Sequence, residues 1–215
     1  MDKKGSELVF EKIHKSAHNI FVAGIILCVL FGPISVFGIF MTIKNGFEDY
    51  SIMFFIFALI LALGIFLIVS QRKTLNDPTR SRVIKNNPNI LEMADELIEN
   101  KVYQDQFLIL SPRIIANAAD ITQISYTDEV FLVYIYIHRT NGVIDSKRLT
   151  LETAHGMMGF NIIRQKDEQI NALMQNVLSH CRYSRAGYTP EGLAYANPMR
   201  ELWKKDQECK KASSM

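Results

Sequence analysis

The residues of this chain that could do acid–base chemistry are an adjacent carboxylate pair, Asp128-Glu129, and His155 further along. Two carboxylates and an imidazole can act as general acid and base, or bind a cation, where other polar groups converge on them. The sequence has no phosphate-binding glycine-rich loop, HExxH or GxSxG motif to supply such groups. We expect Asp128-Glu129 to form a solvated turn and His155 to have an ordinary structural or surface role. An enzyme acting at the membrane surface remains an alternative.

The three cysteines and five histidines lack the spacing of a metal site. His180 and Cys181 are neighbours, but adjacent positions on a helix face different directions, so a shared metal is not expected. Cys28 falls in an apolar run and Cys181 on the apolar face of an expected helix, where a thiol behaves as a small hydrophobic group. Because the cysteines are few, odd in number and far apart, we expect no disulfide framework, metal or cofactor.

Basic side chains gather in two places that could contact anionic lipid. One set follows the second apolar run: Arg72, Lys73, Arg80, Arg82 and Lys85. The other lies around an expected hairpin: His138-Arg139, Lys147-Arg148 and Arg164. A well-placed charge near an anionic surface contributes about 1 kcal/mol. The alternative is topological charge and a solvated sheet face. With a net charge of +2 and no basic stripe among aromatics, nucleic acid is not an expected partner.

The positioning elements begin with two uncharged runs, residues 20–43 and 51–70. Spanning a bilayer core of ~30 Å takes about 20 apolar residues in a helix, and both runs are long enough. The connector between them is short, so the two helices must be antiparallel neighbours. A cleaved signal peptide is the alternative for the first run, which however exceeds the usual apolar length of ~7–15 residues. The sequence predicts a transmembrane helical hairpin over residues 19–70.

The orientation of the hairpin follows from its flanking charges. The N-terminal segment, residues 1–18, carries Lys3, Lys4, Lys12 and Lys15. The second run is followed by the first basic set, whereas the connector carries only Lys44 with Glu48 and Asp49. Because cytoplasmic loops are rich in lysine and arginine, we expect a multi-pass protein of the cell membrane with both termini in the cytoplasm.

Small residues within the runs indicate how the helices pack. Gly24, Cys28 and Gly32 lie four apart in the first run, and Ala58 and Ala62 do so in the second. This spacing lets helix backbones approach closely, either within the hairpin or in a homo-oligomer. A transport or channel component built from the hairpin is one reading. The runs contain no ionisable side chain, however, and such groups usually mark an ion pathway.

The rest of the chain predicts a small α+β domain. We expect a linker and amphipathic helix over residues 71–101, with Asn87 as N-cap before Pro88. Residues 102–182 predict an antiparallel sheet or split barrel with a C-terminal capping helix. Its about six strands are expected at residues 102–110, 114–117, 121–126, 130–139, 143–153 and 157–164, and the helix at 166–181. Asn141-Gly142 is the strongest hairpin signal. The tail, residues 183–215, has helix starts at Pro190 and Pro198 and a frayed end from Lys204.

This arrangement resembles the pleckstrin-homology-like fold, and the whole chain resembles small bacterial membrane proteins with two transmembrane helices and such a cytoplasmic domain. The nearest local features are the segment 120–126 and Asn141-Gly142. The resemblance implies binding or scaffolding and brings no catalytic residues. The leading hypothesis is a non-enzymatic, membrane-anchored adaptor that presents its cytoplasmic domain to a protein partner or to anionic lipid.

Overall fold

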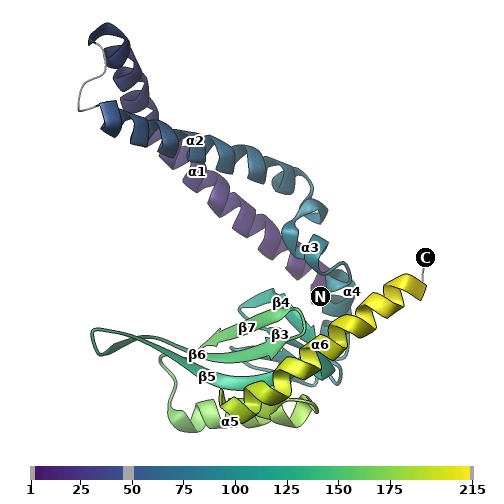
Figure 1. The fold of residues 1–215 in the computed structure, drawn as a ribbon. Helices are drawn as coiled ribbons and strands as arrows, with labels where there is room; N and C mark the ends of the chain where they lie inside the picture. The colour runs from purple at the N-terminus through teal and green to yellow at the C-terminus, as the bar shows by residue number, and fades with distance from the viewer. Residues whose placement is uncertain (1–2, 46–50, 214–215) are drawn as a thin grey trace. The chain divides into compact units, whose positions relative to one another are not determined.

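The computed structural model of the chain describes residues 3–45 and 51–213 (Figure 1). It divides into two compact units, a helical unit of residues 7–89 and a unit formed by residues 90–213 with the start of the chain. The helices are α1 (Gly5–Asn45), α2 (Ser51–Asn76), η1 (Pro78–Arg80), α3 (Arg82–Asn86), α4 (Ile90–Glu99), η2 (Thr127–Glu129), α5 (Asp167–His180) and α6 (Pro190–Ser213). The strands are β1 (Tyr103–Gln104), β2 (Leu108–Leu110), β3 (Ile114–Asn117), β4 (Asp120–Tyr126), β5 (Val130–Thr140), β6 (Val143–Thr153), β7 (Gly156–Asn161) and β8 (Arg185–Ala186).

The helical unit contains two helices that are long and apolar enough to cross a membrane, among the residues that the structure describes. They lie antiparallel and side by side (Figure 1). Only 11% and 6% of their most apolar stretches are buried, unlike the core helix of a soluble protein. Val29 is 67% exposed, Phe37 58% and Phe66 64%. So large an apolar surface needs an apolar environment, and the predicted pair of long apolar helices is confirmed.

The chain between α2 and α4 forms two short helical turns, each started by a side-chain cap. Asp77 accepts a hydrogen bond from the backbone N–H of Thr79, and Ser81 accepts one from that of Ile84. The prediction of Asn87 as N-cap of the next helix is wrong. The Asn87 N–H instead closes the last turn of α3, and α4 begins at Ile90. Because α3 begins at the Ser81 cap, Asn87 falls at the C-terminal end of α3. Its N–H donates there to the carbonyl oxygen of Val83.

The amphipathic helix α4 is confirmed, and its apolar side chains lie where the sequence pattern placed them. Ile90, Met93, Ala94 and Leu97 are all buried, and the helix packs against β3 and β4. The spacing of these residues keeps them on one helix face, so α4 covers the first sheet of the second unit.

Within the described residues the strands form two sheets of four, in the orders β1-β2-β3-β4 and β7-β6-β5-β8. The expected single strand over residues 102–110 is wrong, because a turn at Asp105 divides it into β1 and β2. The Asp105 carboxylate accepts hydrogen bonds from the N–H groups of Phe107 (2.7 Å) and Leu108 (2.8 Å). Such local bonds favour a turn over a continuous strand. All pairs are antiparallel except β5 with the unpredicted β8, which is parallel.

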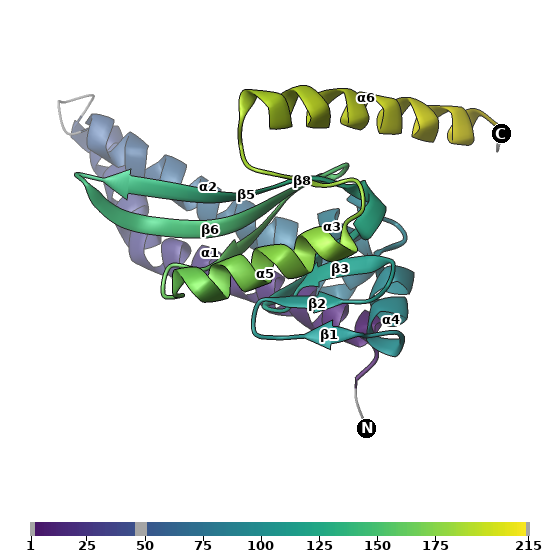
Figure 2. The ribbon, with the colours of Figure 1, turned by 90° about the horizontal axis from the view of Figure 1, so that it is seen from below.

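The central hairpin of the second sheet is the predicted one. Asn141 and Gly142 have φ of 52° and 82°, as a type I′ turn between two strands requires. The main core lies between the two sheets and α5 (Figure 2). Phe160, Leu149, Leu151 and Val133 are fully or almost fully buried there. The α+β class and the capping helix are confirmed, whereas the pleckstrin-homology-like identity of the fold stays a prediction.

The C-terminal helix α6 runs without a break from Pro190 to Ser213. The predicted second helix start at Asn197-Pro198 is therefore wrong, and the frayed end from Lys204, whose last two residues lie outside the described residues, stays a prediction. Pro198 removes one backbone hydrogen bond. That loss is offset because Leu193, Ala196 and Met199, on either side of it, pack on the outer face of the second sheet.

Candidate functional site

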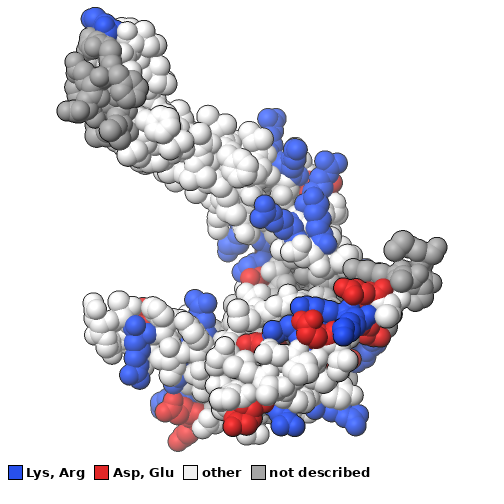
Figure 3. Space-filling model, viewed as in Figure 1, with Lys and Arg blue, Asp and Glu red and all other residues white. Residues whose placement is uncertain are grey.

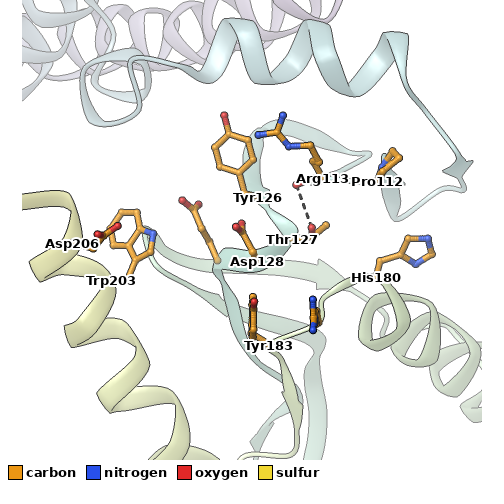
Figure 4. Close-up of a pocket in the computed structure, with 11 residues that line it drawn as sticks. Pro112, Arg113, Tyr126, Thr127, Asp128, His180, Tyr183, Trp203 and Asp206 are labelled. Atoms are coloured by element: carbon orange, nitrogen blue, oxygen red, sulfur yellow. Dashed lines mark hydrogen bonds between the residues drawn. The ribbon is translucent and has the colours of Figure 1, made fainter. Parts of the chain in front are cut away.

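The second unit has a hollow of about 690 Å³ around η2, the short helix between the two sheets. Its lining combines cations, carboxylates and aromatic rings from four parts of the chain (Figure 4). The lining residues are Pro112, Arg113, Tyr126, Thr127, Asp128, Glu129, His180, Arg182, Tyr183, Trp203 and Asp206.

The position of η2 is fixed by backbone bonds to the loop before β3. The N–H of Thr127 donates to the carbonyl of Arg113 at 2.8 Å, and the Thr127 hydroxyl donates to the same oxygen at 3.3 Å (Figure 4). Held this way, η2 leaves Asp128 exposed in the hollow while Glu129 is buried. The prediction of a solvated turn is therefore right for Asp128 and wrong for Glu129.

The structure brings Glu129 and His155 together, although they are far apart in sequence. The Glu129 carboxylate accepts a hydrogen bond from Ser125 Oγ at 3.3 Å and lies 3.4 Å from His155 Nε2. The His155 ring packs edge-on against Trp203, with 4.7 Å between the ring centroids. These contacts connect three elements: η2 through Glu129, the turn after β6 through His155, and helix α6 through Trp203. The pair has the chemistry of an acid and a base, and its contacts hold α6 against the sheet.

The docking of α6 supplies one wall of the hollow. Leu193, Ala196, Met199 and Trp203 recur along one side of the helix and pack with Phe131, Leu132 and Tyr134. A Cβ added at Gly192 would lie 2.6 Å from the carbonyl oxygen of Gly187, so only glycine permits this close approach.

A partly buried ion pair completes this docking. Arg200 Nη2 donates to Glu152 Oε2 at 2.5 Å, and the Glu152 side chain is only 10% exposed. Burial and the nearby Glu152 carboxylate together raise the pKa of Tyr134, which lies on the same face.

The two arginines of the hollow already have partners. Arg113 lies 3.6 Å from the Glu96 carboxylate and 5.8 Å from the centre of the Tyr126 ring. Arg182 lies 5.8 Å from the centre of the Tyr183 ring. Burial, followed by the Glu96 charge, raises the pKa of Tyr126, which stays protonated at neutral pH. The Glu96 carboxylate offsets the charge of Arg113, and the exposed Asp128 with the aromatic rings of the hollow suits a positively charged group.

The predicted lipid-contact residues lie together at one end of the helical unit. Arg72, Lys73, Arg80, Arg82 and Lys85 are all exposed. Arg80 also pairs with Asp77 at 3.0 Å. Figure 3 shows lysine and arginine side chains gathered where α2 gives way to η1 and α3, next to a long uncharged surface.

The predicted packing residues are distributed unevenly between the two long helices. A Cβ on Gly24 would lie 2.9 Å from the carbonyl oxygen of Gly64, and one on Gly64 would lie 3.0 Å from Cys28 Sγ. Gly24 and Cys28 therefore face α2 at its closest approach. Gly32 has its nearest neighbour, Leu61, at 3.9 Å. Ala58 is half-buried and Ala62 is exposed, and Gly64, which sequence reasoning missed, takes the central place instead.

The residues with metal-binding chemistry form pairs at most among the described residues. Within residues 3–45 and 51–213 there is no cluster of three His, Cys, Asp or Glu side chains that could hold a metal ion. His180 Nδ1 lies 2.7 Å from the carbonyl oxygen of Asn176. Burial raises the pKa of the Cys181 thiol to about 12, so it stays protonated at neutral pH.

No protein-family model, curated protein or solved structure matches the chain. The site is thus defined by its geometry and chemistry, and the resemblance to membrane proteins with a pleckstrin-homology-like domain stays a prediction.

Proposed function

We propose that the chain is a membrane-anchored binding module that presents its soluble unit to a protein partner in the cytoplasm. The observation that carries this proposal is the hollow around η2, whose wall is built by docking a whole helix, α6, against the sheet. Its floor and walls are held by buried polar contacts, namely those of Glu129 and Glu152. A preorganised concave surface of this kind favours binding, because little order is lost when a ligand enters.

The partner would offer a lysine or arginine side chain to the hollow. Tyr183 is 43% exposed, and it lines the hollow together with Trp203 and the exposed Asp128. A carboxylate attracts the charged ammonium or guanidinium group, and aromatic faces contact both that group and the apolar stem of the lysine or arginine side chain. The hollow then recognises a basic segment of another protein.

The membrane anchor in this proposal is the pair α1 and α2, with both chain termini on the cytoplasmic side. The support is the exposed apolar surface of both helices, together with the basic residues at the end where α2 leads into η1. These residues would lie at the cytoplasmic headgroups, as the positive-inside rule requires. The contact between Gly24 and Gly64 explains how the two spans pack as one element.

Photocrosslinking in native membranes tests the binding function. A benzophenone amino acid would replace Tyr183 in the full-length protein, and Glu168, exposed at the opposite end of α5, would carry it in the control. We expect a discrete protein adduct from position 183 and none from position 168.

Charge reversal shows whether the adduct depends on the proposed chemistry. Asp128→Lys should reduce the adduct at least about fivefold, since it converts an attraction worth about 1 kcal/mol into repulsion. Glu168→Lys makes the same change of charge away from the hollow and should leave the adduct intact. An adduct that is equally strong in both variants would contradict the proposed recognition of a basic segment.

A further inference from the structure

The hairpin of β5 and β6 extends well beyond the sheet that it belongs to. Strand β7 pairs with β6 only between Arg148 and Thr153, and β8 pairs with β5 only at Leu132 and Val133. The outer part, residues 136–147, is therefore a two-stranded finger that projects from the domain (Figures 1 and 2). A two-stranded hairpin alone is marginally stable in water, so this projection has a cost in stability.

The finger carries exposed apolar side chains at and near its tip. Val143 is 69% exposed, Tyr136 47%, Ile137 42% and Ile144 40%. The register pairs Ile137 with Lys147 and Arg139 with Ile144. One face of the finger therefore carries alternating apolar and basic side chains, namely Ile137, Arg139, Ile144 and Lys147.

The opposite face of the finger carries Tyr136 and Val143 beside a cluster of polar side chains that bond to one another. Asp145 Oδ1 lies 2.7 Å from His138 Nδ1, and Asp145 Oδ2 accepts a hydrogen bond from the Thr140 hydroxyl at 2.6 Å. The hydrogen bond from Thr140, followed by that from His138, lowers the pKa of Asp145. This cluster accompanies the register shift at His138-Arg139 and fixes the shape of the tip. The Asp145 carboxylate is thereby hydrogen-bonded within the finger, while Arg139 on the finger and Arg148 at its base, opposite Tyr136, are exposed.

We propose that the finger docks its tip into the interface of an anionic phospholipid bilayer. Val143 and Ile144 enter the boundary between headgroups and acyl chains, and Arg139 and Arg148 contact lipid phosphates. Exposed aliphatic side chains beside cations match such an interface, which is apolar inside and negatively charged at its surface. Pairing with a second copy would bring like charges together on the finger, so charge complementarity favours the lipid. The inference rests on the membrane anchor of the proposed function and is separate from the hollow around η2.

An environment-sensitive fluorophore at the tip tests this docking. It would be attached to Val143→Cys in a Cys209→Ser background, in full-length protein reconstituted into nanodiscs. The discs would contain phosphatidylcholine alone or mixed with phosphatidylglycerol, each with and without brominated acyl chains. We expect blue-shifted emission and bromine quenching in the anionic discs. Removing two charges with Arg139→Gln and Arg148→Gln should weaken insertion about 25-fold, about fivefold per charge, and Lys205→Gln on α6 should have no effect.

Each other result overturns the proposal in a distinct way. Water-exposed emission in both kinds of disc would mean that the finger does not reach lipid. Insertion that is equal in neutral discs and insensitive to the arginine variants would exclude recognition of anionic headgroups. Blue-shifted emission without bromine quenching would mean that protein, such as a second copy, covers the tip. The photocrosslink at position 183 is unaffected by any of these results, so failure of the docking is distinguishable from failure of the binding function.

Discussion

Replacing Arg200 by alanine should loosen α6 from the second sheet and open one wall of the hollow. The Glu152 carboxylate would then be left only 10% exposed and without its arginine partner. Removing one member of a fully buried ion pair costs about 3–5 kcal/mol. The Arg200 side chain is 30% exposed, so water can compensate for part of the loss, and we expect about 2 kcal/mol. This corresponds to an increase of about 30-fold in the undocked fraction of α6.

Trp203 provides the assay, because it is the single tryptophan of the chain and lies on α6 against His155. In Arg200→Ala its emission should shift to the red, acrylamide should quench it more strongly, and its denaturation midpoint should fall below that of the circular-dichroism signal. Glu152→Gln should have a smaller effect, since Arg200 can turn to solvent. Unchanged emission and quenching in Arg200→Ala would refute the role of the ion pair in docking α6.

Three further predictions concern other contacts. Gly64→Val should disrupt the packing of α1 on α2, because its Cβ would lie 3.0 Å from the Gly24 carbonyl oxygen, and thermal unfolding in detergent should occur at a lower temperature. A maleimide should modify the exposed Cys209 in native protein and Cys181 only after unfolding. The reason is that Cys181 is buried, which raises its pKa to about 12. Mass spectrometry of labelled peptides would show the difference. Asp105→Ala should lose the turn between β1 and β2 and destabilise the domain by about 1–2 kcal/mol in urea titration.

The pH dependence of stability follows from the same thiol. The folded pKa of Cys181 is raised above its ordinary value of 9.0, so its contribution is complete below pH 9 and is lost as the pH rises toward 12. Cys181→Ala should therefore flatten the alkaline decline of the unfolding free energy relative to the wild type. An equally steep decline in both proteins would contradict the burial of the thiol.

The sequence was informative wherever one local pattern determined the structure. Uncharged length predicted α1 and α2, alternation and Asn141-Gly142 predicted the central hairpin, and helical spacing predicted the buried faces of α4 and α5. In each case the periodicity of the apolar side chains agrees with the element that buries or exposes them.

The sequence was uninformative where a distant contact decides. The two residues of β8 carry no strand pattern and pair with β5 only because the chain returns there after α5. Glu129 belongs to an adjacent acidic pair, which predicts exposure to solvent. It is buried because its carboxylate accepts a hydrogen bond from Ser125 and lies against His155. Pro198 normally ends a helix, but the apolar stripe on both sides of it docks on the sheet. The hollow around η2 depends on these same long-range contacts, so no motif could have indicated it.

The most direct test of the membrane-anchored arrangement is the sidedness of two cysteines in intact cells. A membrane-impermeant maleimide would be applied to cells that express either the wild type, with Cys209 on α6, or Lys44→Cys in a Cys209→Ser background. The arrangement predicts that position 44 is labelled in intact cells and that Cys209 is labelled only after the membrane is permeabilised. Labelling of Cys209 from outside, or recovery of the full-length chain in the soluble fraction without detergent, would contradict it.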